Sequence, residues 1–121
     1  MASIRVALAQ LNFRLGDFES NVAAIVEAYD RSVEQNADVV VFSELAVCGY
    51  PPEDLLLKQR FIEDAKAAVT HIATHSTDTV AVVGFPEQEA EDVFNSAAIC
   101  HRGAIAGIYR KQLLPNYSVF D

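Results

Sequence analysis

The sequence predicts an α/β fold built on a mixed sheet, and three observations lead to this prediction. Residues 4–11 and 39–42 are rich in aliphatic residues with little polar alternation, a pattern typical of buried strands. Between them, apolar residues recur at helical spacing, so a strand, a helix and a second strand form a βαβ unit with parallel strands. Further along, a tight turn at residues 101–103 separates two apolar segments, which indicates an antiparallel hairpin.

Two amphipathic helices are predicted, each with one apolar stripe. The first follows Gly16 and Asp17, residues that favour a turn and a helix start, and should end near residues 35–36. The second follows an irregular loop at residues 43–52. The predicted stripes are Val22, Ile25, Val26, Tyr29 and Val33 in the first helix, and Phe61, Ile62, Ala65, Ala68, Val69 and Ile72 in the second.

Three more strands are expected after the second helix, at residues 79–85, 94–100 and 104–109. The acidic residues 86–92 read as a surface loop. Gly103 suits the turn between the last two strands because glycine adopts a positive φ without strain. The remainder, residues 110–121, contains proline and asparagine and is expected to be loop.

Composition narrows the class of partner. The formal net charge is −8 and the sequence pI is about 4.7. Such an acidic surface repels phosphate backbones and anionic lipids, so we expect neither nucleic acid nor membrane as a partner. The opening residues do not resemble a signal peptide. The two cysteines, Cys48 and Cys100, are too few for a disulfide framework, and we expect a cytoplasmic protein.

Two residues whose side chains could take part in catalysis follow predicted strands, at the end of the sheet where open α/β sheets bind ligands. Glu44 lies beside apolar Phe42 and Leu45, so its carboxylate could be partly desolvated and act as a general base. Alternatively, it caps a loop or pairs with a cation. Lys111 could stabilise an oxyanion and hold a carboxylate in place, although a lysine at a strand end is more often a solvated charge.

Read together, the segments around these residues resemble a known family. Residues 42–57 are similar to the segment around the catalytic glutamate of the nitrilase (carbon-nitrogen hydrolase) superfamily. Their Gly-Tyr-Pro-Pro-Glu-Asp-Leu-Leu continuation resembles that of glutamine-dependent NAD synthetases. Residues 109–121 resemble the catalytic-lysine segment, and residues 4–12, with the Gly16-Asp17 pair and Asn21, resemble the family's N-terminal start.

The resemblance implies a particular fold, of which this chain would form only a part. Complete domains of this family are αββα sandwiches of two facing sheets. Residues 1–121 would form an incomplete carbon-nitrogen hydrolase (glutamine amidotransferase) domain that supplies one mixed sheet with helices on one face. The other face would be uncovered, and exposed apolar strands favour self-association. We therefore expect the isolated chain to be unstable or a homo-oligomer.

The resemblance also implies a Glu-Lys-Cys amidase that hydrolyses glutamine. Glu44 would be the general base, Lys111 would stabilise the tetrahedral intermediates, and Tyr117 would help to bind glutamine. The cysteine nucleophile would lie beyond Asp121, so the 121-residue chain alone is expected to be inactive. Ser118 stands where the family usually has glycine.

In the parent enzyme, ammonia would pass to a synthetase domain, absent here, that uses ATP and Mg to amidate deamido-NAD. This segment itself would need no cofactor.

Several alternatives stay open. Cys48 shares a loop with Glu44, but no cation follows nearby, so it and Cys100 read as buried structural residues. His71 and His75 lie four apart on a helix without a third ligand, and we expect no metal.

The chain could instead belong to a nitrilase-type amidase with another amide substrate, or persist as a non-catalytic oligomerisation or interaction module.

Overall fold

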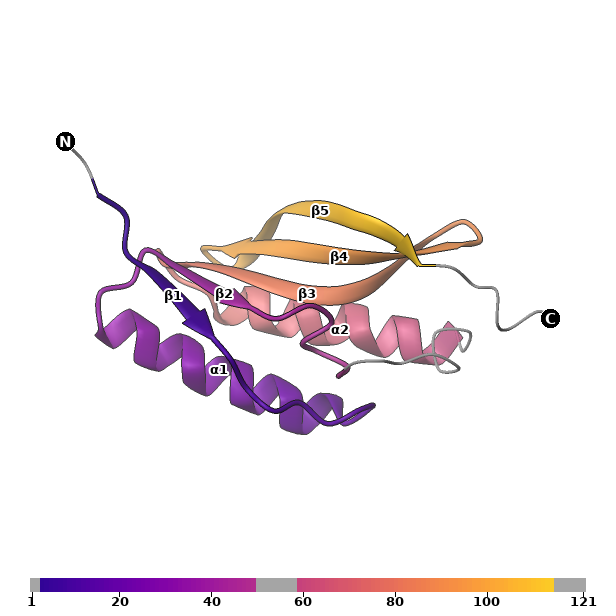
Figure 1. The fold of residues 1–121 in the computed structure, drawn as a ribbon, viewed down its shortest axis with the longest axis horizontal. Helices are drawn as coiled ribbons and strands as arrows, with labels where there is room; N and C mark the ends of the chain where they lie inside the picture. Colours follow the sequence, from indigo (N-terminus) through magenta and orange to yellow (C-terminus); the bar gives the residue numbers. More distant parts are fainter. Residues whose placement is uncertain (1–2, 50–58, 115–121) are drawn as a thin grey trace.

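The computed structural model describes residues 3–49 and 59–114. Within these residues the strands form one sheet in the order β1-β2-β3-β4-β5 (Figure 1). β1 to β3 run parallel, whereas β4 and β5 are antiparallel to their neighbours, so the predicted mixed sheet is confirmed. In chain order the elements are β1 (Val6–Ala9), α1 (Phe18–Glu34), β2 (Val39–Phe42), α2 (Gln59–His75), β3 (Val80–Glu89), β4 (Asp92–His101) and β5 (Ala104–Leu114).

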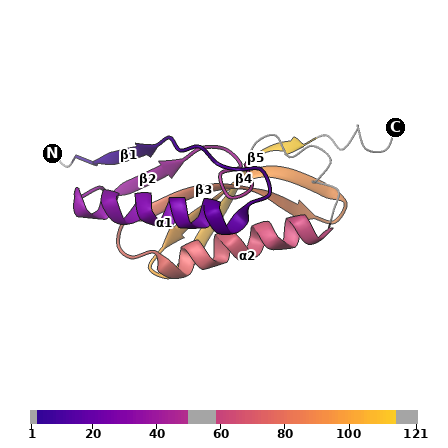
Figure 2. The ribbon, with the colours of Figure 1, turned by 90° about the horizontal axis from the view of Figure 1, so that it is seen from below.

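Both helices lie on the same face of the sheet (Figure 2). Their apolar stripes pack on alternate residues of the central strands, so that Ile25 of α1 and Val69 of α2 share one core with Val40 and Phe85. All four are almost fully buried. Burying an apolar side chain of this size contributes about 1.5–3 kcal/mol, so this shared core stabilises the packing of both helices on the sheet.

The sequence predicts the ends of α1 correctly. Asp17 caps the helix, because its Oδ1 accepts a hydrogen bond of 3.0 Å from the Ser20 N–H. The helix closes at Gln35, and Asn36 then takes the left-handed conformation at φ 62°. Asparagine tolerates that conformation better than other side chains, which explains why the chain turns there.

The β3–β4 hairpin is longer than predicted. Residues 86–92 were expected to form a surface loop, but β3 continues to Glu89 and β4 begins at Asp92, leaving Ala90 and Glu91 as the turn. The acidic residues are on a hairpin that projects into solvent, and Pro86 at its base is buried. The acidic residues therefore correctly predicted that this segment is exposed, but the prediction that it forms a loop instead of strands was wrong.

The two outer strands also depart from prediction. β1 is shorter than residues 4–11, because its partner β2 offers only four residues, from Val39 to Phe42. β5 does not end at Tyr109 but continues to Leu114, so Arg110 and Lys111 lie within a strand rather than in a loop. Ion pairs from Arg110 to two glutamates of β3 hold this end of β5, and these contacts are not visible in the apolar pattern.

The face of the sheet opposite the helices is open in the part of the chain that the structure describes. Its apolar side chains include Leu8, 74% exposed, and Tyr109, 64% exposed. Separately, no described helix combines the length and apolar character needed to cross a membrane.

Candidate functional site

The loop that carries Glu44 crosses directly over β3. Glu44 begins a turn immediately after β2, and the Val47 N–H donates a 3.3 Å hydrogen bond to the Gly84 carbonyl oxygen of β3. A Cβ at Gly84 would lie 2.5 Å from the Leu45 nitrogen and 2.7 Å from the Ser43 carbonyl oxygen. Glycine at this position therefore allows the backbone on both sides of Glu44 to rest on the sheet.

A second set of contacts fixes the far end of the same loop. Asn21 of α1 is buried and donates from Nδ2 to the carbonyl oxygens of Val47, at 3.0 Å, and Arg14, at 2.8 Å. The Gly16 N–H donates a 2.8 Å hydrogen bond to the Cys48 carbonyl oxygen. The loop is thus attached to both the sheet and the start of α1, which restricts the position of Glu44.

Lys111 occupies an irregularity in β5. Ser96 of β4 pairs with Arg110 and Asn95 pairs with Gln112, so Lys111 has no residue opposite it. An extra residue of this kind forms a β-bulge, a feature that often redirects a side chain near active sites. The Lys111 ammonium forms an ion pair with Oε2 of Glu44.

Asn95 completes the site. This residue is 3% exposed, and its Nδ2 donates a 3.2 Å hydrogen bond to Oε1 of Glu44. The two oxygens of Glu44 therefore have different partners: a neutral amide on one side and a cation on the other. The site joins residues from the loop after β2, from β4 and from β5.

The burial of Glu44 differs from the expectation. Its side chain is 47% exposed and that of Lys111 is 52% exposed. Desolvation of the carboxylate, which the apolar neighbours suggested, is therefore weak in this structure. Of the two alternatives weighed for Glu44, pairing with a cation describes its surroundings, and this pairing is compatible with a catalytic role.

Sequence reasoning identified part of this site. Glu44 and Lys111, 67 positions apart in the chain, are brought together, whereas Tyr117 lies outside the described residues. Asn95 and Gly84 were missed. Asn95 gave one signal, since an asparagine followed by serine interrupts an otherwise apolar strand, and polar residues buried in a strand need partners.

The two cysteines are buried and free. Burial raises the pKa of the Cys48 thiol to about 12 and that of the Cys100 thiol to about 11. The thiolate is the reactive form of cysteine, so both residues are inert near neutral pH. This agrees with their interpretation as structural residues, and neither has the environment of a nucleophile.

The two histidines of α2 have separate surroundings. His75 Nε2 lies 2.8 Å from Oδ1 of Asp30 on α1, whereas His71 lines a groove between the helices. Among residues 3–49 and 59–114, no three His, Cys, Asp or Glu side chains gather as a metal site would require.

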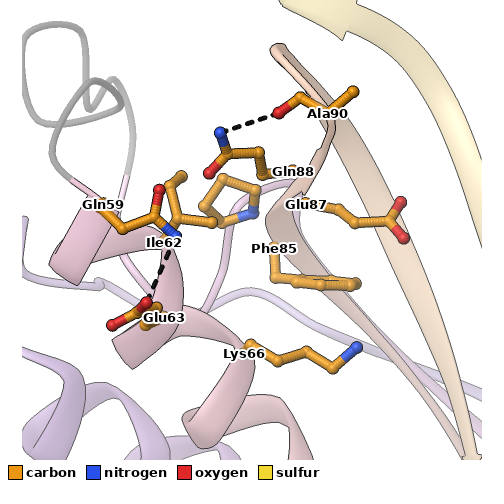
Figure 3. Close-up of a pocket in the computed structure, with 9 residues that line it drawn as sticks. Gln59, Ile62, Glu63, Lys66, Phe85, Glu87, Gln88 and Ala90 are labelled. Carbon is orange, nitrogen blue, oxygen red and sulfur yellow. Dashed lines mark hydrogen bonds between the residues drawn. The ribbon is translucent and has the colours of Figure 1, made fainter.

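A cavity among the described residues lies away from the Glu44 site. It has a volume of about 440 Å³ and lies between the start of α2 and the β3–β4 hairpin (Figure 3). Its lining includes Glu63 and Lys66 of α2 and Phe85 and Glu87 of β3, but neither Glu44 nor Lys111. Glu44 and Lys111 are instead about half exposed.

The structure thus combines a mixed α/β sheet with a paired carboxylate and ammonium beside a buried asparagine. Such a pair offers a proton acceptor and a fixed positive charge within reach of one substrate carbonyl. The family model described as carbon-nitrogen hydrolase matches residues 5–120, and the chain belongs to that family.

Known relatives are consistent with this assignment. The chain is 43% identical over 120 residues to the glutamine-dependent NAD(+) synthetase of Aquifex aeolicus, a match that covers 98% of this chain and 21% of the relative. The structure of a glutamine-dependent NAD(+) synthetase from Cytophaga hutchinsonii matches with a TM-score of 0.88 and 30% identity, covering 95% of this chain and 20% of that one.

A second kind of relative is a shorter enzyme. A mutant amidase from Nesterenkonia, solved with the acetamide moiety of fluoroacetamide on its active-site cysteine, matches with a TM-score of 0.78 and 26% identity. The match covers 95% of this chain and 46% of the amidase. The chain therefore spans about a fifth of the synthetases and under half of this amidase.

Proposed function

We propose that this chain forms the first part of a glutamine-hydrolysing domain that supplies ammonia for ATP-dependent NAD synthesis in a complete enzyme. The observation that carries the proposal is the Glu44–Lys111 ion pair, held by Asn95 beside the open face of the sheet. The similarity to several glutamine-dependent NAD(+) synthetases along nearly the whole chain supports the choice of substrate.

In this mechanism Glu44 acts as the general base. It takes the proton from a cysteine thiol supplied by chain beyond Asp121, and the sulfur attacks the carboxamide carbon of glutamine. Glu44 then returns the proton to the leaving nitrogen, which departs as ammonia and leaves a thioester. In the second half, Glu44 takes a proton from water, hydroxide attacks the thioester, and glutamate leaves as the thiol is restored.

Lys111 stabilises the negative charge on the carbonyl oxygen in both tetrahedral intermediates. A fixed ammonium beside a developing oxyanion is worth more in a site that excludes water than in solution. The half-exposed pair of this chain would become such a site once the rest of the domain covers the sheet. The Nesterenkonia amidase, whose active-site cysteine carries an acetamide moiety, supports cysteine as the missing nucleophile.

The remaining roles stay predictions. Tyr117 would contact glutamine, ATP and Mg would act in the separate synthetase domain, and the complete enzyme would be a cytoplasmic homo-oligomer. A second candidate function is hydrolysis of another small amide, favoured by the likeness to the Nesterenkonia amidase. Comparing glutamine with short aliphatic amides as substrates separates the two.

The test is ammonia release by the complete gene product, with Glu44→Gln and Lys111→Ala as variants. Each should lower kcat by about 10²- to 10⁴-fold, the usual contribution of a positioned acid–base or electrostatic group. Glu34→Gln, an exposed glutamate at the far end of α1, is the matched control and should leave kcat unchanged. Retention of more than half of the activity by Glu44→Gln would contradict the proposal.

The isolated 121-residue chain gives a complementary test. It should release no ammonia from glutamine, because both of its cysteines are buried and the Cys48 thiol donates to the backbone carbonyl oxygens of Leu45 and Gly49. Cysteine-dependent release would overturn the assignment of the nucleophile to later residues. If the complete gene product is also inactive, the interaction-module alternative takes the place of the enzyme.

A further inference from the structure

A second charged cluster lies behind the Glu44 site. Arg110 of β5 donates from Nε to Oε1 of Glu87, at 2.9 Å, and from a terminal nitrogen to Oε2 of Glu89, at 2.6 Å. Its guanidinium carbon lies 4.6 Å from the centre of the Phe94 ring on β4. Ser96 of β4 donates a further 2.9 Å hydrogen bond to Glu87. We call these five residues the Arg110 clamp.

The clamp spans three strands. β5 pairs with β4, and β4 with β3, so Arg110 reaches across β4 to bind glutamates on β3. The Glu87 side chain is 15% exposed and is more buried than that of Arg110, its ion-pair partner. Glu87 and Lys66 of α2 both line the cavity shown in Figure 3. Planar guanidinium groups hold carboxylates in a fixed geometry, which makes arginine better suited than lysine to such a clamp.

The clamp and the candidate site lie on opposite faces of the sheet. Neighbouring residues of a strand point to opposite faces. Asn95 and Ser96 are neighbours in β4, where Asn95 binds Glu44 and Ser96 binds Glu87. Arg110 and Lys111 are neighbours in β5 and bind the same two glutamates from opposite sides. Arg110 binds Glu87, and Lys111, at the bulge, binds Glu44.

The register of β5 needs such a support. Its pairing with β4 shifts at two places, between Asn95 and Ser96 and between Ile99 and Cys100. A one-residue slip of a strand moves every side chain to the other face, and here it would carry Lys111 away from Glu44. The short turn before Ala104 is separated from Lys111 by the shift at Ile99/Cys100, and Lys111 itself stands at the other shift, so contacts close to Lys111 are needed to hold its register.

We propose that the Arg110 clamp is a positioning device for the candidate catalytic lysine, with Arg110 and Glu87 as positioning residues that act through Lys111. The clamp fixes the register of β5 from the helix-covered face, and Lys111 reaches Glu44 on the other. This inference rests on the proposed function, because the position of Lys111 matters for catalysis only if Lys111 is a catalytic residue.

The test uses the complete gene product with Arg110→Gln and Glu87→Gln, and follows ammonia release from glutamine per folded molecule. Each variant should lower kcat by about 10- to 100-fold, the loss expected from a misplacement of about 1 Å, while KM stays within about twofold. The double variant should lose no more than Arg110→Gln alone, because both residues act through one contact. Arg110→Lys, which keeps the charge, should give an intermediate kcat.

Two control variants separate positioning from general stability. Arg102→Gln removes an exposed arginine–aspartate pair with Asp78 at the far end of the sheet, and should leave kcat unchanged. Tyr29→Phe removes buried hydrogen bonds with Thr79 and Thr77, also far from Lys111, and should lower the unfolding temperature without lowering kcat. A kcat for Arg110→Gln within twofold of the unsubstituted enzyme overturns the inference, as does an equal loss in Tyr29→Phe.

The outcome also distinguishes the two proposals. If Lys111→Ala keeps full activity, the proposed function fails, whatever the clamp variants do. If Lys111→Ala abolishes activity and Arg110→Gln does not lower it, the function stands and the clamp is only a structural ion pair.

Discussion

Gly84 lies directly beneath the backbone of Leu45, the residue that follows Glu44. A Cβ at position 84 would approach the Leu45 nitrogen to 2.5 Å, closer than any real Cβ contact. The atoms it would meet belong to the backbone of residues 43–45, which cannot move aside as a flexible side chain can. The close approach of these two residues therefore sets the height of Glu44 above the sheet.

Gly84→Ala should destabilise the protein and displace Glu44. Overpacking of this kind usually costs about 1–3 kcal/mol, and here the strain falls on the loop that carries the general base. Thermal unfolding of the complete gene product measures the first effect, and its release of ammonia from glutamine measures the second. Gly107→Ala is the matched control, because a Cβ at Gly107 meets nothing within 4 Å. Equal stability of the two variants would show that the loop can rise without strain.

Asn95→Ala should lower kcat for glutamine hydrolysis. The Asn95 amide donates to one oxygen of Glu44, and a hydrogen bond to a charged group contributes about 1.5–3 kcal/mol, which corresponds to roughly 10- to 100-fold in rate if it is realised in the transition state. Asn95→Asp should be worse, since it places a second carboxylate beside the first. Steady-state kinetics of the complete gene product provide the measurement.

The control for Asn95 is Asn36→Asp. Asn36 is exposed between the end of α1 and the start of β2, and aspartate also accepts its positive φ. Its kcat should not change. If Asn95→Asp were as active as this control, Asn95 would not orient Glu44.

The elements with a periodic apolar pattern could be predicted from the sequence, whereas those that depend on contacts between strands could not. The stripes of α1 and α2 and the buried run of β2 follow from local periodicity. The full lengths of β3 and β5 do not, because Glu87 and Arg110 read as surface charges until they are brought together. Likewise, motif resemblance found Glu44 and Lys111, but the role of Gly84 depends on a loop that crosses it from 40 positions away.

Alkylation at neutral pH should leave Cys48 and Cys100 unmodified. Burial raises the pKa of the two thiols to about 12 and about 11, so almost no thiolate forms at pH 7. Iodoacetamide followed by mass spectrometry of the 121-residue chain measures this, and the same reaction in denaturant should label both cysteines. Rapid labelling of Cys48 that glutamine prevents would instead indicate a nucleophile within this chain.

Glu87→Gln should reduce the acid sensitivity of the chain. The Arg110 guanidinium, and to a lesser extent the Ser96 hydroxyl, hold the pKa of Glu87 below its ordinary value of 4.5. The ion pair therefore contributes fully above that value, and its contribution is lost as the pH falls through the lower pKa of the folded state.

The variant should lose about 1 kcal/mol of unfolding free energy at pH 7 and less at pH 3. Urea unfolding at several pH values measures the difference, with Asp78→Asn, from an exposed pair, as the control. A loss independent of pH would mean that packing, rather than ionisation, accounts for the effect.

Leu8→Lys should reduce self-association of the 121-residue chain. Leu8 is 74% exposed on the open face and lies in β1, the terminal strand of the described sheet, which has β2 as its only paired neighbour there. Exposed apolar strands at a sheet edge pair with other chains, and a lysine at the edge opposes this. Thr70→Lys adds the same charge at an exposed position on α2 and is the matched control. Sedimentation velocity should show a shift toward monomer for Leu8→Lys alone. An equal shift in both variants would attribute the effect to net charge, and a monomeric unsubstituted chain with a cooperative thermal transition would contradict the prediction.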